Sequence, residues 1–243
     1  MEKEYEEEGF CLLKNFLNKQ EIKDIKFLIE KYHEKYKNKM SIYDVNYTSD
    51  NKINSIHCLH KFDNTFIDFF KSKKLEESVK KLLKSDEIEI TEIQSFMKPS
   101  NTGLESPLHQ DNALWCYNDS KCLTAWIALD SVSVENSGIK FYKKSHKLGI
   151  LEHVPSFKLG TSQTINEKEY SKFDTKNYVI NSLEPGDVQF HHPSIIHGSD
   201  KNISEKSRNS LVCCFKDKNT YVVQEKYKKR MKSLLEQQEY LKK

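Results

Sequence analysis

Glycine and proline are scarce in this chain of 243 residues, which contains seven glycines and five prolines. A collagen-like or linker-rich protein needs far more of both. Apolar runs are also short, because no stretch approaches the roughly 20 residues that span a bilayer. The acidic opening, residues 1–10, lacks the apolar segment of a secretory signal. These absences predict one large domain, residues 1–243, with no membrane partner.

Cysteine pairs with C-x-x-C spacing are missing as well. The chain has six cysteines, none of them in a C-x-x-C arrangement: Cys11, Cys58, Cys116, Cys122, Cys213 and Cys214. A small disulfide-stapled domain would be much richer in cysteine. We interpret all six as free thiols, which predicts a reducing, cytoplasmic location.

Arginine is nearly absent, since Arg208 and Arg230 are the only two among 39 basic residues. The lysines are spread along the chain and mixed with 36 acidic residues, so that the formal net charge is only +3. A nucleic-acid-binding protein needs clustered basic residues and a recognition motif, and the sequence shows neither. We therefore expect no nucleic-acid partner.

The first part of the chain, about residues 1–86, has a helical pattern. Asn18 followed by Glu21 is typical of a capping box, and apolar residues then recur at helical spacing as far as Tyr36. A second helix is predicted over residues 73–84, where Leu75, Val79, Leu82 and Leu83 share a face.

From residue 87 onward the pattern changes to short strands separated by turns. Strands are predicted in residues 87–99, 123–129, 139–143, 187–192 and 210–215, with turn signals at 99–103, 136–138 and 185–187. Helices followed by such strands indicate an α+β chain whose core, about residues 87–216, is an antiparallel sandwich or barrel. A charged amphipathic helix is predicted within the last part, residues 217–243. The polar segment 154–178 has no clear periodicity, and we interpret it as a substrate-facing flap.

A candidate metal site begins with His109 and Asp111. Residues i and i+2 of a strand point to the same face, so this H-x-D pair can offer an imidazole and a carboxylate to one ion. A distant histidine, such as His197, would complete a two-histidine, one-carboxylate triad with open positions for other ligands. The short motif also arises by chance, and then it is simply a surface pair.

The second motif strengthens the metal interpretation. Arg208 follows His197 by eleven residues in a chain that otherwise uses lysine. A guanidinium pairs a carboxylate through two parallel hydrogen bonds, which an ammonium group cannot do. The spacing therefore favours a carboxylate-bearing co-substrate beside the metal.

These motifs, in this order, resemble the phytanoyl-CoA dioxygenase-like (PhyH-like) family of iron(II)- and 2-oxoglutarate-dependent oxygenases. The matching segments are HQD (109–111), TAWIALDSVSVENSG (124–138), KKSHKLG (143–149) and PGDVQFHHPSIIHGSDKNISEKSR (185–208), and the opening EEGFCLLKNFLNKQEI is similar to the family's start. The resemblance implies a double-stranded β-helix, a jelly-roll and cupin-like barrel, with N-terminal helices packed on one sheet and a C-terminal helix.

The same resemblance implies roles for individual residues. His109, Asp111 and His197 would ligate iron and carry the catalysis, and Arg208 would bind the distal carboxylate of 2-oxoglutarate, helped by Ser199. Trp126 and Gln94 match positions near the co-substrate. One of the adjacent histidines His191 and His192 must point into the barrel, where it could support a metal ligand or simply be a core residue.

The implied activity is hydroxylation of an unactivated C–H bond with O₂, releasing succinate and CO₂, with ascorbate as a further reductant. The presence of Asp111 favours hydroxylation, because related halogenases lack this carboxylate. We expect a small polar metabolite as substrate and a monomer or weak homodimer. Two alternatives stay open: a cupin-type metal protein or enzyme that does not use 2-oxoglutarate, and a binding module without turnover.

Overall fold

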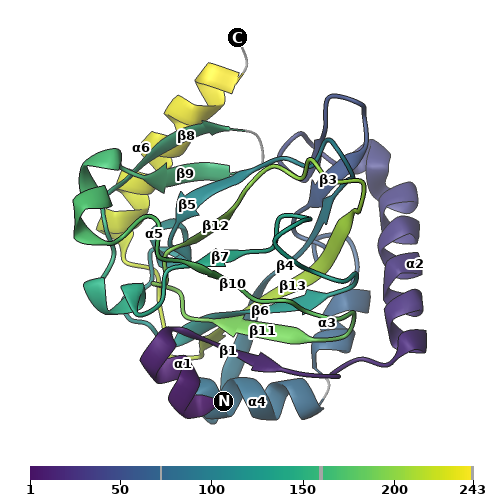
Figure 1. Ribbon diagram of the computed structural model, residues 1–243, viewed down its shortest axis with the longest axis horizontal. Helices are drawn as coiled ribbons and strands as arrows, with labels where there is room; N and C mark the ends of the chain where they lie inside the picture. Colours follow the sequence, from purple (N-terminus) through teal and green to yellow (C-terminus); the bar gives the residue numbers. More distant parts are fainter. Residues whose placement is uncertain (72, 159–160, 242–243) are drawn as a thin grey trace.

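Two antiparallel sheets form the centre of the computed structural model, which describes residues 1–71, 73–158 and 161–241. The larger sheet has the strand order β1 (Phe10–Leu13), β11 (Val188–His191), β6 (Cys122–Ala128), β13 (Arg208–Asp217), β4 (Ile88–Lys98), β3 (Ile53–Ile56) and β2 (Val45–Tyr47). The smaller sheet has the order β10 (Val179–Ile180), β7 (Lys140–Phe141), β12 (His197–Ser199) and β5 (Ser106–His109). A separate hairpin joins β8 (His153–Lys158) to β9 (Thr161–Ile165). Strands from distant parts of the chain thus alternate within each sheet (Figure 1).

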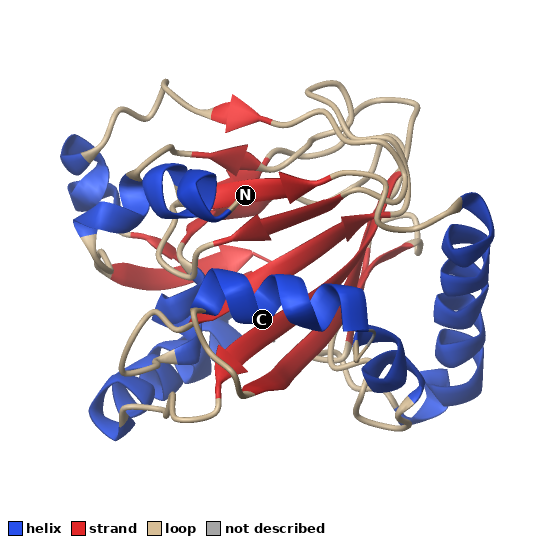
Figure 2. Ribbon diagram, turned by 90° about the horizontal axis from the view of Figure 1, so that it is seen from below, coloured by secondary structure: helices blue, strands red, loops and turns tan. Residues whose placement is uncertain are grey.

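Helices surround these strands (Figure 2). The α-helices are α1 (Glu2–Glu8), α2 (Lys19–Tyr36), α3 (Thr65–Phe70), α4 (Lys73–Leu83), α5 (Asp111–Trp115) and α6 (Gln224–Leu241), and the 3-10 helices are η1 (Lys37–Lys39), η2 (Ser145–Leu148) and η3 (Glu167–Lys172). Helix α2 lies at one side of the sheets, and α6 lies at the opposite side beside β8 and β9 (Figure 1). Over the described ranges, no helix combines the length and the apolar character that crossing a membrane would require.

The larger sheet has two chemically different faces. Alternate residues of β6 and β13 face the helices and build the main apolar core, together with residues of α2, α3 and α4: Leu123, Ala125, Ile127, Leu211, Cys213, Phe215, Ile25, Ile29, Phe70 and Val79. The intervening residues, among them Thr124 and Trp126, lie on the other face, toward the smaller sheet. Period-two alternation therefore places the helical core on one side and leaves the other side for a site.

The N-terminal third contributes more than the predicted helices. Strand β1 pairs with β11 in the register Phe10↔His191, and β2 and β3 extend the far edge of the same sheet. These strands are only three or four residues long. Such short segments carry too little periodicity to be recognised, and their partners lie far along the chain.

The polar segment 154–178 is also more regular than its sequence suggests. It contains most of the β8–β9 hairpin and all of η3, except that residues 159 and 160 lie outside the described part. The lack of periodicity in the sequence therefore does not mean a lack of regular structure, and the substrate-facing flap stays a prediction. The buried amide of Gln237 on α6 accepts a hydrogen bond from the Phe157 N–H (2.5 Å) and donates one to the Lys158 carbonyl (3.0 Å). Helix α6 thereby holds the hairpin in place.

The predicted capping box at the start of α2 is confirmed. The Asn18 side-chain oxygen accepts hydrogen bonds from the backbone N–H groups of Gln20 (2.8 Å) and Glu21 (3.0 Å). In return the Glu21 carboxylate accepts from the Asn18 N–H at 2.7 Å. These bonds satisfy backbone donors that the first turn of a helix otherwise leaves free.

We expect Asn18→Ala to lower the free energy of unfolding by about 1 kcal/mol, because the methyl group cannot accept these bonds. Chemical denaturation measures the change. The exposed Asn38→Ala, in η1, is the matched control and should have little effect. Equal stability of the two variants would contradict a role for the cap.

Candidate metal centre

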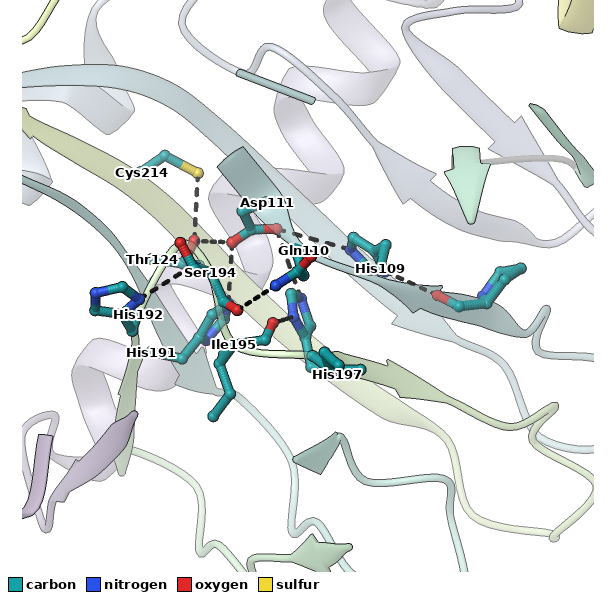
Figure 3. A network of polar contacts seen from close by, with 12 residues as sticks. His109, Gln110, Asp111, Thr124, His191, His192, Ser194, Ile195, His197 and Cys214 are labelled. Carbon is teal, nitrogen blue, oxygen red and sulfur yellow. Dashed lines mark hydrogen bonds and ion pairs between the residues drawn. The ribbon is translucent and has the colours of Figure 1, made fainter. Parts of the chain in front are cut away.

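The candidate ligands come together where β5, the edge strand of the smaller sheet, pairs with β12. His109 ends β5, His197 begins β12, and the two residues are direct partners in the antiparallel register. Their rings lie 4.2 Å apart between centroids. Asp111 begins α5 directly after β5, so its carboxylate turns back toward both imidazoles (Figure 3).

Backbone carbonyl groups orient both imidazoles. His109 Nδ1 lies 2.8 Å from the Pro107 carbonyl oxygen, and His197 Nδ1 lies 3.0 Å from that of Ile195. A carbonyl oxygen only accepts, so each Nδ1 carries the proton and each Nε2 keeps its lone pair. Both Nε2 atoms point to Asp111 Oδ1, at 3.7 Å from His109 and 3.6 Å from His197.

The two oxygens of Asp111 have different surroundings. Oδ2 accepts a hydrogen bond from the Thr124 hydroxyl at 2.7 Å and lies 3.2 Å from His191 Nε2. Oδ1 faces the two ligand histidines instead. Supporting hydrogen bonds of this kind fix a carboxylate and leave one oxygen for a metal.

Burial and mutual contact shift the titration of these groups. Burial lowers the pKa of His109, and it lowers that of His197 to about 3, with the neighbouring His109 contributing. Burial alone would raise the pKa of Asp111, but His197, His191 and His109 together hold it well below its usual range. Neutral imidazoles and an ionised carboxylate are the forms that bind a metal ion.

Gln110, between the two ligands of the H-x-D motif, faces away from the centre. Its side-chain amide donates to the carbonyl oxygens of Gly149 (2.8 Å) and Ser194 (2.6 Å) and accepts from the Leu151 N–H (2.8 Å). These bonds fasten the motif to two other chain segments, so that the ligands on either side of Gln110 are held in position.

The trio fits a ferrous ion. One ligand atom from each of His109, Asp111 and His197 lies within 4.8 Å of the others. Two imidazoles and one carboxylate on a single face are the ligand set of non-haem iron(II) oxygenases, and they leave open positions for a chelating co-substrate and O₂. Metal ligation by these three residues stays a proposal, for which the geometry is the support.

Arg208 is buried deep in the same interior. Only 2% of its surface is exposed, and its guanidinium carbon lies 5.2 Å from the ring centroid of Trp126. One guanidinium nitrogen donates to the Ser137 carbonyl at 3.1 Å, whereas Nε has no hydrogen-bond partner. Among the described residues no carboxylate forms an ion pair with Arg208. Burial lowers the pKa of this arginine to about 10.

Lys98 is a second buried cation, which the sequence analysis missed. It is the direct partner of Arg208 in the β4–β13 register and is 3% exposed. Burial and then the Arg208 charge lower its pKa well below the usual range. Its ammonium group donates to the Ser199 hydroxyl at 2.7 Å. The alternation Gln94, Phe96, Lys98 along a predicted strand was the available signal, because it places all three on one face.

The remaining predicted co-substrate residues lie near these cations. Ser199 follows His197 by two residues on β12, Trp126 contacts Arg208, and Gln94 faces the interior from β4. Of the two adjacent histidines, His191 points inward to Asp111, whereas His192 packs on the opposite side against His146, with ring centroids 4.9 Å apart.

Solved structures with the same fold show which class of protein it defines. The non-haem α-ketoglutarate-dependent carbocyclase SnoK from nogalamycin biosynthesis superposes with a TM-score of 0.73 at 18% identity, covering 90% of this chain and 84% of its own. EctD from S. alaskensis, solved with 2-oxoglutarate and 5-hydroxyectoine, gives a TM-score of 0.69 at 18% identity, covering 88% and 74%. The fold is the jelly roll of iron- and 2-oxoglutarate-dependent enzymes, and the predicted fold class is confirmed.

The particular family follows from the sequence. The profile of phytanoyl-CoA dioxygenase (PhyH) matches residues 5–210, so the chain belongs to that family. It is 25% identical to the peroxisomal phytanoyl-CoA dioxygenase of Bos taurus over 232 residues, 90% of this chain and 68% of the relative. It is 27% identical to the phytanoyl-CoA dioxygenase of Arabidopsis thaliana over 154 residues, 63% and 53% of the two chains.

We expect Asp111→Ala to abolish tight binding of a divalent metal, since the site then keeps two neutral ligands and no charge. Calorimetric titration of Mn²⁺, a redox-stable substitute for Fe²⁺, into both proteins measures the loss. Asp119→Ala, in the loop after α5, changes a carboxylate outside the ligand trio and should leave the affinity as it is. Wild-type affinity in Asp111→Ala would remove this residue from the ligand set.

The depressed histidine pKa values predict how metal binding depends on pH. Histidines with an ordinary pKa near 6.5 would be mostly protonated at pH 5.5, and two of them would cost about 100-fold in affinity relative to pH 7.5. Burial lowers the pKa of His197 to about 3, so His197 stays neutral at pH 5.5, and it also lowers the pKa of His109, so the affinity should fall less than 100-fold. Protonation of His197 should weaken binding further only as the pH approaches about 3, the pKa of this residue. A 100-fold loss between pH 7.5 and 5.5 would contradict the assignment.

Proposed function

We propose that this protein is an iron(II)- and 2-oxoglutarate-dependent hydroxylase that acts on an unactivated C–H bond of a small polar metabolite and releases succinate and CO₂. His109, Asp111 and His197 would hold the iron. Arg208, Lys98 and Ser199 would bind the distal carboxylate of the co-substrate, with Trp126 and Gln94 alongside.

The observation that carries this proposal is the pair of buried cations. Taking an isolated charge out of water costs several kcal/mol, so buried charges normally have a partner of opposite sign. Arg208 and Lys98 lie side by side, and no described carboxylate pairs with Arg208. A carboxylate supplied by a ligand compensates both charges at once.

The separation of the cations from the metal ligands suits a short dicarboxylate. His197 and Ser199 lie on one face of β12, two residues or about 7 Å apart along the strand. Because Lys98 donates a hydrogen bond to the Ser199 hydroxyl, its ammonium group lies beside Ser199. A ligand that chelates the metal through one end can therefore reach the cations with its other carboxylate.

The iron and its co-substrate, when bound, would supply the oxidising power for C–H hydroxylation with O₂. The chain's own contribution is positional. Thr124 and His191 hold one oxygen of Asp111, and the carbonyls of Pro107 and Ile195 hold the two imidazoles. Asp111 also occupies the carboxylate position of the triad, which favours hydroxylation.

Polar groups beside the metal ligands support a small polar substrate. Glu92 is the register partner of Cys214, which pairs with Thr124, so Glu92 lies in the same interior row as the support of Asp111. Burial, and then the Asp111 charge, raise the pKa of Glu92 to about 7, while Arg230 of α6 acts in the opposite direction. Helix α6 thus brings a cation near this carboxylate, and Nε of Arg230 is buried without a hydrogen-bond partner.

The proposal includes the wider organisation of the protein. We infer a single domain in which about residues 1–86, 87–216 and 217–243 are the N-terminal part, the β-helix core and the C-terminal helix. We further propose that the protein is a monomer or weak homodimer in the cytoplasm. It would use O₂ as oxidant and ascorbate as reductant. The cysteines, all of them free thiols, fit a reducing compartment.

A cupin-type metal protein that does not use 2-oxoglutarate fits the interior less well, because the buried Arg208 would then form no ion pair with any carboxylate of the described residues. Succinate formation decides between the two. The iron-loaded protein, incubated with 2-oxoglutarate, O₂ and pools of small metabolites, should form succinate in a metal-dependent manner. Turnover that needs no 2-oxoglutarate would favour the cupin alternative, and 2-oxoglutarate binding without any succinate would favour a binding module.

We expect Arg208→Ala to weaken 2-oxoglutarate binding by about 30-fold or more, because truncating one partner of a buried charge pair costs roughly 2–5 kcal/mol. Arg208→Lys should also weaken binding, since lysine keeps the charge but loses the planar fork. Calorimetry on the Mn²⁺-loaded variants measures both affinities. Metal affinity without 2-oxoglutarate should change little.

The exposed Lys206→Ala is the matched control for these variants. It removes a cation two residues before Arg208 and should bind 2-oxoglutarate like the wild type. Unchanged affinity in Arg208→Ala would overturn the co-substrate assignment.

A further inference from the structure

Four neighbouring strands place one residue each in a row across the inner face of the larger sheet. The row runs Gln189 on β11, Trp126 on β6, Val212 on β13 and Gln94 on β4, each the direct register partner of the next. Residues directly opposite each other in antiparallel strands lie on the same face. The neighbouring row contains Thr124, whose hydroxyl donates to Asp111. Within the present row, Trp126 contacts Arg208. It therefore lies between the candidate metal ligands and the buried cations.

His57, which follows β3, controls the amide of Gln94. Its Nδ1 lies 2.6 Å from Gln94 Oε1, and its Nε2 lies 3.1 Å from Asn46 Nδ2 and 3.1 Å from Ser55 Oγ. The Asn46 amide nitrogen also donates to Ser55 Oγ at 3.0 Å. The ring is thus held at both nitrogens by residues of β2, β3 and β4.

The donor and acceptor roles in this network follow from one atom. An amide nitrogen such as Asn46 Nδ2 only donates, so His57 Nε2 must accept and carries no proton. The neutral ring then has its proton on Nδ1 and donates it to Gln94 Oε1. Burial lowers the pKa of His57, which favours this neutral form. With its oxygen occupied, Gln94 turns its NH₂ group away from His57.

Gln189, at the other end of the row, is oriented in the same way by a different residue. Asn181 Nδ2 donates to Gln189 Oε1 at 2.6 Å. Gln189 is 2% exposed, and no described residue accepts a hydrogen bond from its Nε2 or from that of Gln94. Two separate contacts therefore occupy both glutamine oxygens and leave both NH₂ groups available to the interior.

We propose that His57 and Asn181 are positioning residues that turn the NH₂ groups of Gln94 and Gln189 toward the co-substrate, so that this row presents only hydrogen-bond donors to an anionic, acceptor-rich ligand. This inference rests on the proposed function. Without the two orienting residues, each amide is free to rotate its carbonyl oxygen toward the ligand, where two acceptors would face each other. His57 and Asn181 thus act on 2-oxoglutarate only through the glutamines.

The first test is the affinity of the Mn²⁺-loaded full-length protein for 2-oxoglutarate, measured by calorimetry. His57→Leu should weaken binding by about 10-fold, the scale of one oriented hydrogen bond. His57→Asn should stay within about threefold of the wild type, because its side-chain NH₂ can replace the Nδ1–H donor. His60→Leu, three residues further along and outside the network, is the matched control and should bind normally.

A double-mutant cycle separates positioning from a general structural effect. If His57 acts through Gln94, His57→Leu should cause no further loss of 2-oxoglutarate affinity in a Gln94→Leu background. A structural effect of the substitution would weaken binding equally in both backgrounds. The same cycle with Asn181→Leu and Gln189→Leu tests the second pair independently, and it keeps the proposal open to refutation if His57→Leu does not fold.

The possible outcomes distinguish the inference from the function on which it rests. If the wild type does not bind 2-oxoglutarate, the proposed function fails and the inference fails with it. If the wild type binds and both His57→Leu and Asn181→Leu bind equally well, only the inference is overturned. Additive losses in both cycles would likewise overturn it, and loss restricted to the glutamine-containing backgrounds supports it.

Discussion

The alternation of side chains along β4, β6, β11 and β13 is the constraint on which the rest of the structure depends. The side chains on one face of these strands are buried in the apolar core beneath α2, α3 and α4. The other face then holds polar residues in register, from Glu92, Thr124 and His191 through Gln94, Trp126 and Gln189 to Lys98 and Arg208. A slip of one residue in any strand would exchange the two faces, so the stability of the core also enforces the geometry of the site.

The charged side chains of the interior lie at its two ends. At one end the ionised Asp111 lies beside the candidate ligand imidazoles, and at the other Arg208 and Lys98 are buried together. Neither arrangement is favourable for an isolated chain, because each buries charge that nothing of opposite sign fully compensates. A cation at the first end and a carboxylate at the second would relieve both. We therefore expect occupancy of the Asp111 end and of the Arg208 and Lys98 end to be coupled. A single ligand that reaches both ends would bridge their opposite charges.

The sequence predicted the elements that local patterns define. The capping box at Asn18 and the apolar spacing that follows it identified α2, period-two alternation identified β4, and short apolar runs between turn signals identified β6 and the middle of β13. The H-x-D motif, His197 and Arg208 were found because their residue types are unusual at those spacings. Lys98 was missed because one lysine among so many stands out little, and the alternation that places it on the face of Gln94 does not reveal that β4 and β13 pair Lys98 with Arg208. His57 and Asn181 were missed for a related reason, since their effect depends on contacts made by strands too short to recognise.

Gln110 connects the candidate metal site to chain segments that carry none of its ligands. Its amide ties the H-x-D segment to the chain near Gly149 and Leu151 and to Ser194, which lies three residues before His197. A ligand that binds only the native arrangement stabilises every segment that the arrangement requires. Binding at the centre should therefore slow local opening of these loops, and loss of the ion should release them before the helical core unfolds. In the cell, the lifetime of the protein would then follow the supply of iron, even in the absence of any substrate.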